Sequence, residues 1–120
     1  MAKGDDIQER LVNFAVDVIH LCGSFPKTEP GRHVSGQLLR CGTSPASNYA
    51  EARGAESRKD FVHKMGVVLK ELNEAQIWLQ IVRKSNMLPI GSTDSILNEC
   101  VELSRIANAS IRTAKVKIDN

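Results

Sequence analysis

The sequence predicts an all-α protein with the architecture of an antiparallel up-down four-helix bundle. Apolar residues recur at spacings of three and four in four successive segments, which is the period of an amphipathic helix. No segment alternates polar and apolar residues for long enough to predict a sheet, and the connectors are short. A chain of 120 residues is expected to form a single domain over residues 1–120.

The first helix is expected over about residues 6–22. Asp6 is its predicted N-cap, with Glu9 at the capping-box position. A connector rich in Pro and Gly follows, and a second helix is expected over about residues 31–54. The apolar face of this second helix combines Val34, Leu38, Cys41, Pro45, Tyr49 and Ala52.

The stretch CGTSPASNYAEA interrupts the second helix with Gly, Thr, Ser and Pro. The apolar spacing stays in phase across it, so we predict one helix kinked at Pro45, with a break near Thr43 as the alternative. Pro45 lacks an N–H and crowds the carbonyl four residues earlier. Thr43, Ser44 and Asn48 are expected to hydrogen-bond the freed backbone groups.

The third helix is expected over about residues 58–84 and the fourth over about residues 93–118. Ser57, with Asp60 three residues later, forms the predicted capping pair of the third helix. The cysteines are far apart and no C-x-x-C occurs, so each is expected to be a small buried hydrophobe: Cys22, Cys41 and Cys100.

Neither a nucleophile nor a metal site is predicted. Ser44 lies in G-T-S-P-A, whereas a hydrolase elbow has G-x-S-x-G after a strand. Two Asp-x-x-His pairs, Asp17 with His20 and Asp60 with His63, approximate the metal motif of di-metal bundles. Both histidines, however, point away from the apolar stripes. The chain is therefore expected not to be an enzyme and to need no cofactor or metal.

Basic side chains form the candidate contacts to RNA or DNA, mainly by charge and so with strong salt dependence. They fall into two groups, near the turn between the second and third helices and on one flank of the last helix: Arg53, Arg58 and Lys59, and Arg105, Arg112 and Lys115. Because the formal net charge is only +2, ordinary solvated helix surfaces are the alternative.

The third helix is apolar on its back as well, which predicts a self-association surface. Its predicted interface residues are Val67, Glu74, Trp78 and Ile81. Scattered surface hydrophobes are the alternative.

Several segments resemble a bacterial four-helix-bundle family named for proteins encoded in intervening sequences of 23S rRNA genes. They are QLLRCGTSPASNYAEAR at 37–53, SRKDFVHKM at 57–65, VLKELNEAQIWL at 68–79 and ASIRTAK at 109–115. The resemblance implies a kinked second helix and homo-oligomers, with a homopentameric ring expected, and no catalytic residues. A relative, the accessory variability determinant of diversity-generating retroelements, is a basic barrel that binds nucleic acid and a reverse transcriptase.

We therefore expect a non-enzymatic oligomeric bundle that contacts RNA, DNA or a nucleic-acid enzyme such as a reverse transcriptase. The alternative is a structural or protein-interaction module without nucleic-acid binding. No segment approaches the length of a membrane span, and no signal peptide is evident, so a cytoplasmic protein without membrane contact is expected.

Overall fold

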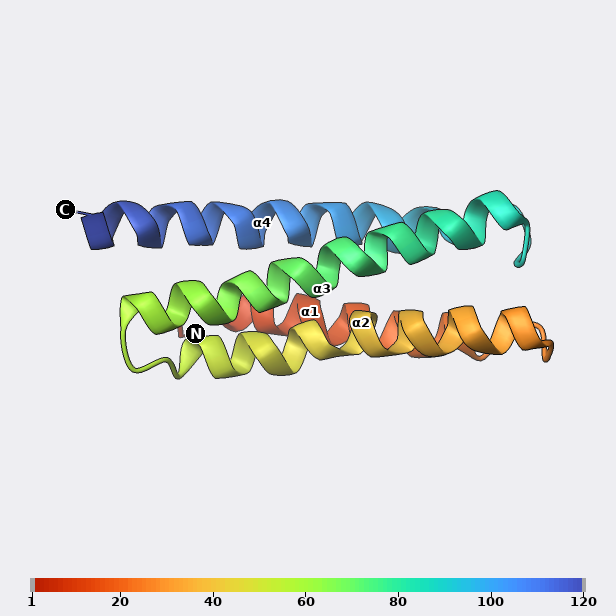
Figure 1. Ribbon diagram of the computed structural model, residues 1–120, viewed down its shortest axis with the longest axis horizontal. Coiled ribbons are helices and arrows are strands. Elements are labelled where there is room, and N and C mark those ends of the chain that lie inside the picture. Colours follow the sequence, from red (N-terminus) through yellow and green to blue (C-terminus); the bar gives the residue numbers. More distant parts are fainter. Residues whose placement is uncertain (1, 120) are drawn as a thin grey trace.

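The computed structural model describes residues 2–119, in which the chain forms four helices (Figure 1). The helices are α1 at Asp5–Cys22, α2 at Glu29–Arg53, α3 at Arg58–Ser85 and α4 at Asp94–Asp119. The chain reverses direction at each connection, and consecutive helices pack side by side. The predicted all-α fold is confirmed, and every helix end lies within two residues of its expected position.

The start of α1 differs from the prediction. The N-cap is Gly4, at φ 90°, and the helix begins at Asp5 without a side-chain cap, so Asp6 is not the cap. A left-handed backbone at this position favours glycine. A Cβ on Gly4 would also lie 2.8 Å from the Tyr49 hydroxyl, so the start of α1 is seated directly against the end of α2.

Side-chain caps set the starts of the next two helices. Oγ1 of Thr28 accepts a hydrogen bond from the Gly31 N–H at 3.2 Å. Pro30 occupies the first turn, where a missing N–H costs nothing; α2 therefore begins two residues earlier than expected. Oγ of Ser57 accepts from the Asp60 N–H at 3.1 Å, which confirms the predicted cap of α3.

The segment around Pro45 belongs to one helix. α2 runs unbroken through Pro45, so the alternative break near Thr43 is wrong, while the kink itself stays a prediction. The Thr43 hydroxyl donates to the Leu39 carbonyl at 2.6 Å, and not to the Cys41 carbonyl, which is the group that Pro45 leaves without a donor. The Ser44 hydroxyl instead donates to the Glu71 carboxylate at 3.3 Å, so it joins α2 to α3 rather than satisfying the local backbone.

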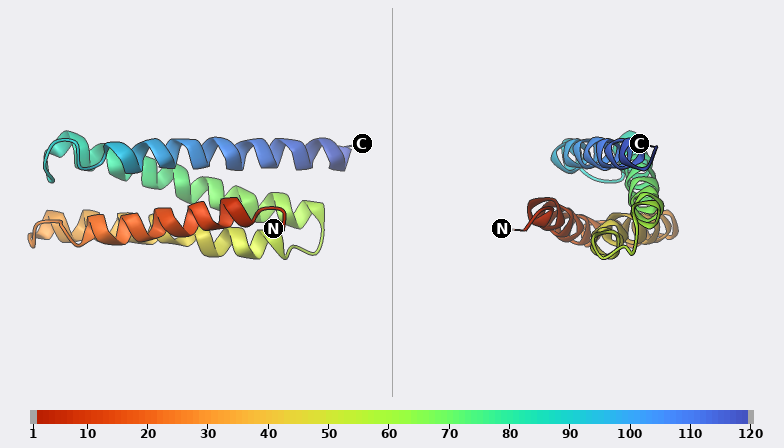
Figure 2. Two further views of the ribbon diagram at one scale, coloured as in Figure 1. Left: turned by 180° about the vertical axis from the view of Figure 1, so that it is seen from behind. Right: turned by 90° about the vertical axis from the view of Figure 1, so that its left-hand side faces the viewer.

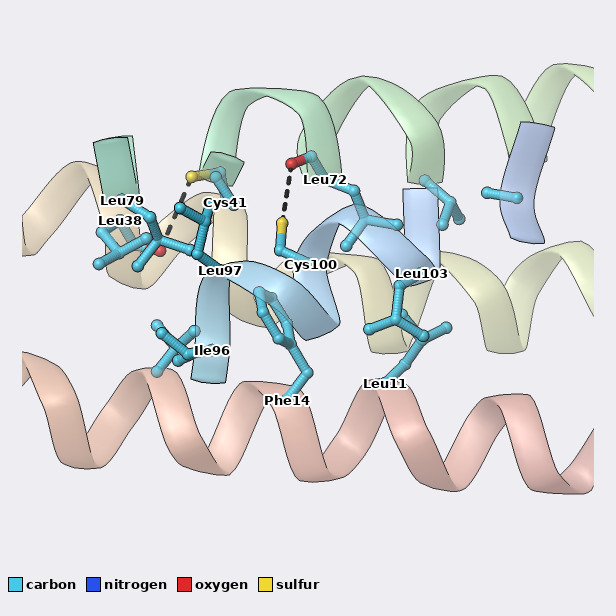
Figure 3. Packing of buried hydrophobic residues seen from close by; sticks show 14 of the residues in the cluster. Leu11, Phe14, Leu38, Cys41, Leu72, Leu79, Ile96, Leu97, Cys100 and Leu103 are labelled. Carbon is cyan, nitrogen blue, oxygen red and sulfur yellow. Dashed lines mark hydrogen bonds between the residues drawn. The ribbon is translucent and has the colours of Figure 1, made fainter. Parts of the chain in front are cut away.

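The core is built mainly from aliphatic side chains of all four helices. Figure 3 shows Phe14 pointing from α1 toward Cys100 and Leu97 of α4. All three cysteines are buried, as predicted. Burial raises the pKa of Cys41 and of Cys100 to about 12, so both thiols stay protonated at neutral pH and pack as hydrophobes.

The fourth corner of the bundle is incompletely filled. α1 has 18 residues, whereas α2, α3 and α4 have 25, 28 and 26. At ~1.5 Å per residue, α1 is therefore at least ~10 Å shorter than its neighbours. The contact between α1 and α4 is also the slightest between neighbouring helices, and the end view in Figure 2 shows these two helices standing apart. The final turns of α4 extend beyond the start of α1 (Figures 1 and 2).

Candidate nucleic-acid interface

The unfilled corner contains a hollow at the end of the bundle where α1 begins and α4 ends. This end hollow has a volume of about 640 Å³. The α4 side chains that line it are spaced by one, three and four residues, so they share one flank of the helix. They are Ile106, Ala109, Ser110, Thr113, Ala114 and Lys117.

Basic side chains from four parts of the chain surround the end hollow. Lys3 precedes α1, Arg53 ends α2, Arg58 begins α3, and Lys117 lies in the last turns of α4. Among the described residues, no carboxylate lines it. Nor does any carboxylate of residues 2–119 lie within ion-pair distance of Lys3, Arg58 or Lys117. These three cations are therefore available to an anion.

Arg53 has a different role. Its guanidinium donates to the Lys3 carbonyl at 2.9 Å and to the Asp5 carboxylate at 2.7 Å. These contacts fasten the start of α1 to the end of α2, and the bond from Arg53 lowers the pKa of Asp5. Arg53, predicted as a nucleic-acid contact, thus holds Lys3 at the rim of the end hollow while its own charge is largely neutralised.

The other predicted basic residues lie elsewhere. Lys59 is exposed next to Arg58 but does not line the end hollow. Arg105 lines a separate shallow groove between α3 and α4, together with Asn108, and lies 3.9 Å from Glu102. Helical spacing places Arg112 and Lys115 on that same flank of α4, opposite the end hollow. The sequence therefore predicted the basic residues on one flank of α4 but not Lys3 and Lys117, which line the end hollow.

Two of the predicted interface residues of α3, Glu74 and Trp78, contact α2. Trp78 is half-buried and packs edge-on against His33, with ring centroids 5.9 Å apart. Glu74 accepts from Arg40 at 3.0 Å. Val67 is half-buried, whereas Ile77 and Ile81 are exposed. We call Ile77, Trp78 and Ile81 the α3 patch.

A second exposed apolar surface was not predicted. Val12, Val16 and Ile19 of α1 are exposed at spacings of four and three, and Leu39 is exposed on α2. Two hydrogen bonds join α1 to α2 on either side of these residues, from Gln8 to the Ala46 carbonyl and from Cys22 to the Ser35 carbonyl. We call the four exposed residues the α1–α2 seam.

Catalytic and metal-binding residues were expected to be absent. His20 and His63 are both exposed on the surface. Within residues 2–119, no three His, Cys, Asp or Glu side chains gather closely enough to hold a metal ion. In the same range, no helix combines the length and apolar character needed to cross a membrane.

Comparison with known proteins identifies relatives of this chain. The family model described as 23S rRNA-intervening sequence protein matches residues 5–109. A crystal structure from Bacteroides thetaiotaomicron, described as a protein of unknown function from the S23 ribosomal protein family, is 30% identical with a TM-score of 0.82. The match covers 88% of this chain and 97% of that one. No curated protein matches. Lys3, Arg112, Lys115 and Lys117 lie outside the matched residues.

Proposed function

Because the chain belongs to the 23S rRNA-intervening sequence protein family, we propose that it is a non-enzymatic, self-associating bundle of the cytoplasm that binds RNA or DNA by charge. The observation that carries this proposal is the convergence of Lys3, Arg58 and Lys117 on one end of the bundle, around a hollow that no described carboxylate lines. Such clustering provides a strong local positive charge although the net charge is only +2.

We expect removal of two of these cations to weaken nucleic-acid binding. Arg58→Gln combined with Lys117→Gln should lower the affinity for an oligonucleotide at least about tenfold at low salt, because fewer counterions are released. The slope of log affinity against log salt should become shallower by roughly 1.5 to 2. Fluorescence anisotropy across a salt series measures both quantities.

The matched control is Arg112→Gln with Lys115→Gln, which removes the same charge from the opposite flank of α4. We expect this pair to change affinity and slope less than the pair at the end hollow. Equal losses in the two variants would assign binding to diffuse charge around α4. Unchanged binding in both would favour the alternative, a protein-interaction module whose partner is another protein, such as a reverse transcriptase.

Self-association is proposed to use two different surfaces. A closed ring such as a pentamer has head-to-tail interfaces, so each subunit must carry two complementary patches. The α1–α2 seam and the α3 patch are two exposed apolar surfaces on different helices. Burying them against each other between subunits would remove both from water.

A mixing experiment tests this arrangement. Val16→Lys should disable the α1–α2 seam and Ile81→Lys the α3 patch, so each variant alone should sediment as a monomer. Mixed together, the two variants should form a dimer and nothing larger, since each retains the patch that the other has lost. Val116→Lys, on α4, places the same charge at a residue outside both patches and should leave the assembly intact. Assembly of either variant alone, in sedimentation velocity, would contradict the proposal.

A further inference from the structure

The end hollow has the dimensions of a ligand site. Its volume of about 640 Å³ falls within the range of roughly 300–1,000 Å³ found for small-molecule and cofactor sites. It lies where α4 continues past the start of α1 (Figures 1 and 2), so that the last turns of α4 face the end of α2 and the start of α3 with no part of α1 between them. A single nucleotide or a group of similar size fits such a space, whereas a whole duplex does not.

The lining has two chemically distinct parts. Lys3, Arg58 and Lys117 supply positive charge from three separate parts of the chain. Between them lie uncharged side chains: Ala52, Phe61, Ile106, Ala109, Thr113 and Ala114. An occupant that satisfies both parts carries negative charge on one portion and a weakly polar, compact body on another. A nucleotide has this combination, with its phosphate for the cations and its base for the apolar walls.

A base in a duplex cannot reach these walls. It is stacked and paired, and it must be flipped out before it can enter a pocket, which costs free energy. A base in a single strand, a loop or an overhang is already accessible, and an aromatic side chain such as Phe61, which lines the hollow, can stack on it with little dependence on sequence. The end hollow should therefore bind unpaired nucleic acid more tightly than paired nucleic acid. Attraction between the cations and the phosphates alone distinguishes the two forms poorly.

We propose that the end hollow binds one unpaired nucleotide of a single-stranded segment, with its base against the walls contributed by α3 and α4 and its phosphates at Lys3, Arg58 and Lys117. This proposal rests on the proposed function and deepens it. The charged rim accounts for affinity, and the hollow accounts for a preference for unpaired over paired strands.

The test separates the hollow from the charge. Ala109→Leu with Thr113→Leu fills part of the hollow without altering any charge, and leucine is well tolerated on a helix surface. Asn108→Leu adds the same side chain on the opposite flank of α4 and serves as the control. Far-UV circular dichroism and the melting temperature establish that both variants remain folded. Anisotropy is then measured with a single-stranded oligonucleotide and with a blunt hairpin of equal length, at one salt concentration.

We expect the wild type and the Asn108→Leu control to bind the single strand at least about tenfold more tightly than the hairpin, and the filled variant to lose that preference. The inference would be overturned if the wild type bound the single strand and the hairpin with equal affinity, or if the filled variant kept the preference for the single strand. Either result would leave charge-based binding intact. If the wild type binds neither the single strand nor the hairpin even at low salt, both the inference and the proposed function fail. A nucleoside monophosphate could also displace the single strand from the wild type at micromolar concentration but fail to do so in the filled variant. That result would overturn the inference that a strand is the ligand and would assign the site to a free nucleotide.

Discussion

Replacing Phe14 by Ala is expected to lower the free energy of unfolding by about 3–5 kcal/mol. Phe14 is 1% exposed and extends from α1 toward α4 (Figure 3). These two helices make the slightest contact of any neighbouring pair in the bundle. The ion pair between Arg10 and Glu99, at 2.6 Å, also joins α1 to α4. It is retained in the variant, so the loss reflects the cavity left by the Phe14 ring.

Urea denaturation, followed by far-UV circular dichroism at one protein concentration, measures this loss. The concentration must be fixed because assembly would add to the apparent stability. Val116→Ala is the control, since Val116 of α4 is 59% exposed, lies outside both proposed association surfaces, and its truncation should change the stability by about 0.5 kcal/mol or less. Similar losses in the two variants would show that α1 does not contribute its Phe14 face to the core.

Two Gly→Ala substitutions in α2 are expected to change the stability in opposite directions. At Gly31 a Cβ would overlap the Pro26 carbonyl oxygen and lie 3.1 Å from the Pro26 carbonyl carbon. Backbone atoms between two prolines cannot easily move aside, so Gly31→Ala should cost about 1–3 kcal/mol. At Gly36 a Cβ would meet nothing within 4 Å, and Gly36→Ala should add about 0.5–1 kcal/mol through the helix propensity of alanine.

The same denaturation experiment applied to both variants provides the comparison. Each acts as the control for the other, because the chemical change is identical and both residues lie in α2. If both substitutions raised the stability, the connector carrying Pro26 would not be packed against the start of α2. A loss at both positions would mean that the Gly36 side of α2 is covered by something other than this chain.

Much of the fold could be predicted from the sequence because the apolar period determines which residues face the core. The Ser57 cap was equally predictable, since it depends only on residues three apart. The start of α1 was not, because it depends on a left-handed Gly4 held against Tyr49, a contact between distant segments. The early start of α2 was missed because Pro30 was assigned to the connector, although proline fits the first turn of a helix.

The candidate site was less predictable than the fold, for a geometric reason. A helical wheel identifies residues on one flank of one helix, and it therefore grouped Arg112 and Lys115. The grouping of Lys3, Arg58 and Lys117 depends on where the ends of three elements lie in space. The wheel also places Trp78 on the back of its helix, but only the packing of the neighbouring helix reveals that His33 of α2 partly covers it.

The short first helix has a consequence for the dynamics of the molecule. α1 packs chiefly on α2 and only slightly on α4, so we expect its detachment to expose less surface than the separation of α2 or α3. We therefore expect local opening of α1 to need less free energy than global unfolding. Because Lys3 lies on the rim of the end hollow only while Arg53 holds the start of α1 in place, an occupant of the hollow would bind the docked form more tightly. By linkage, it would suppress the opening of α1 and slow hydrogen exchange along that helix.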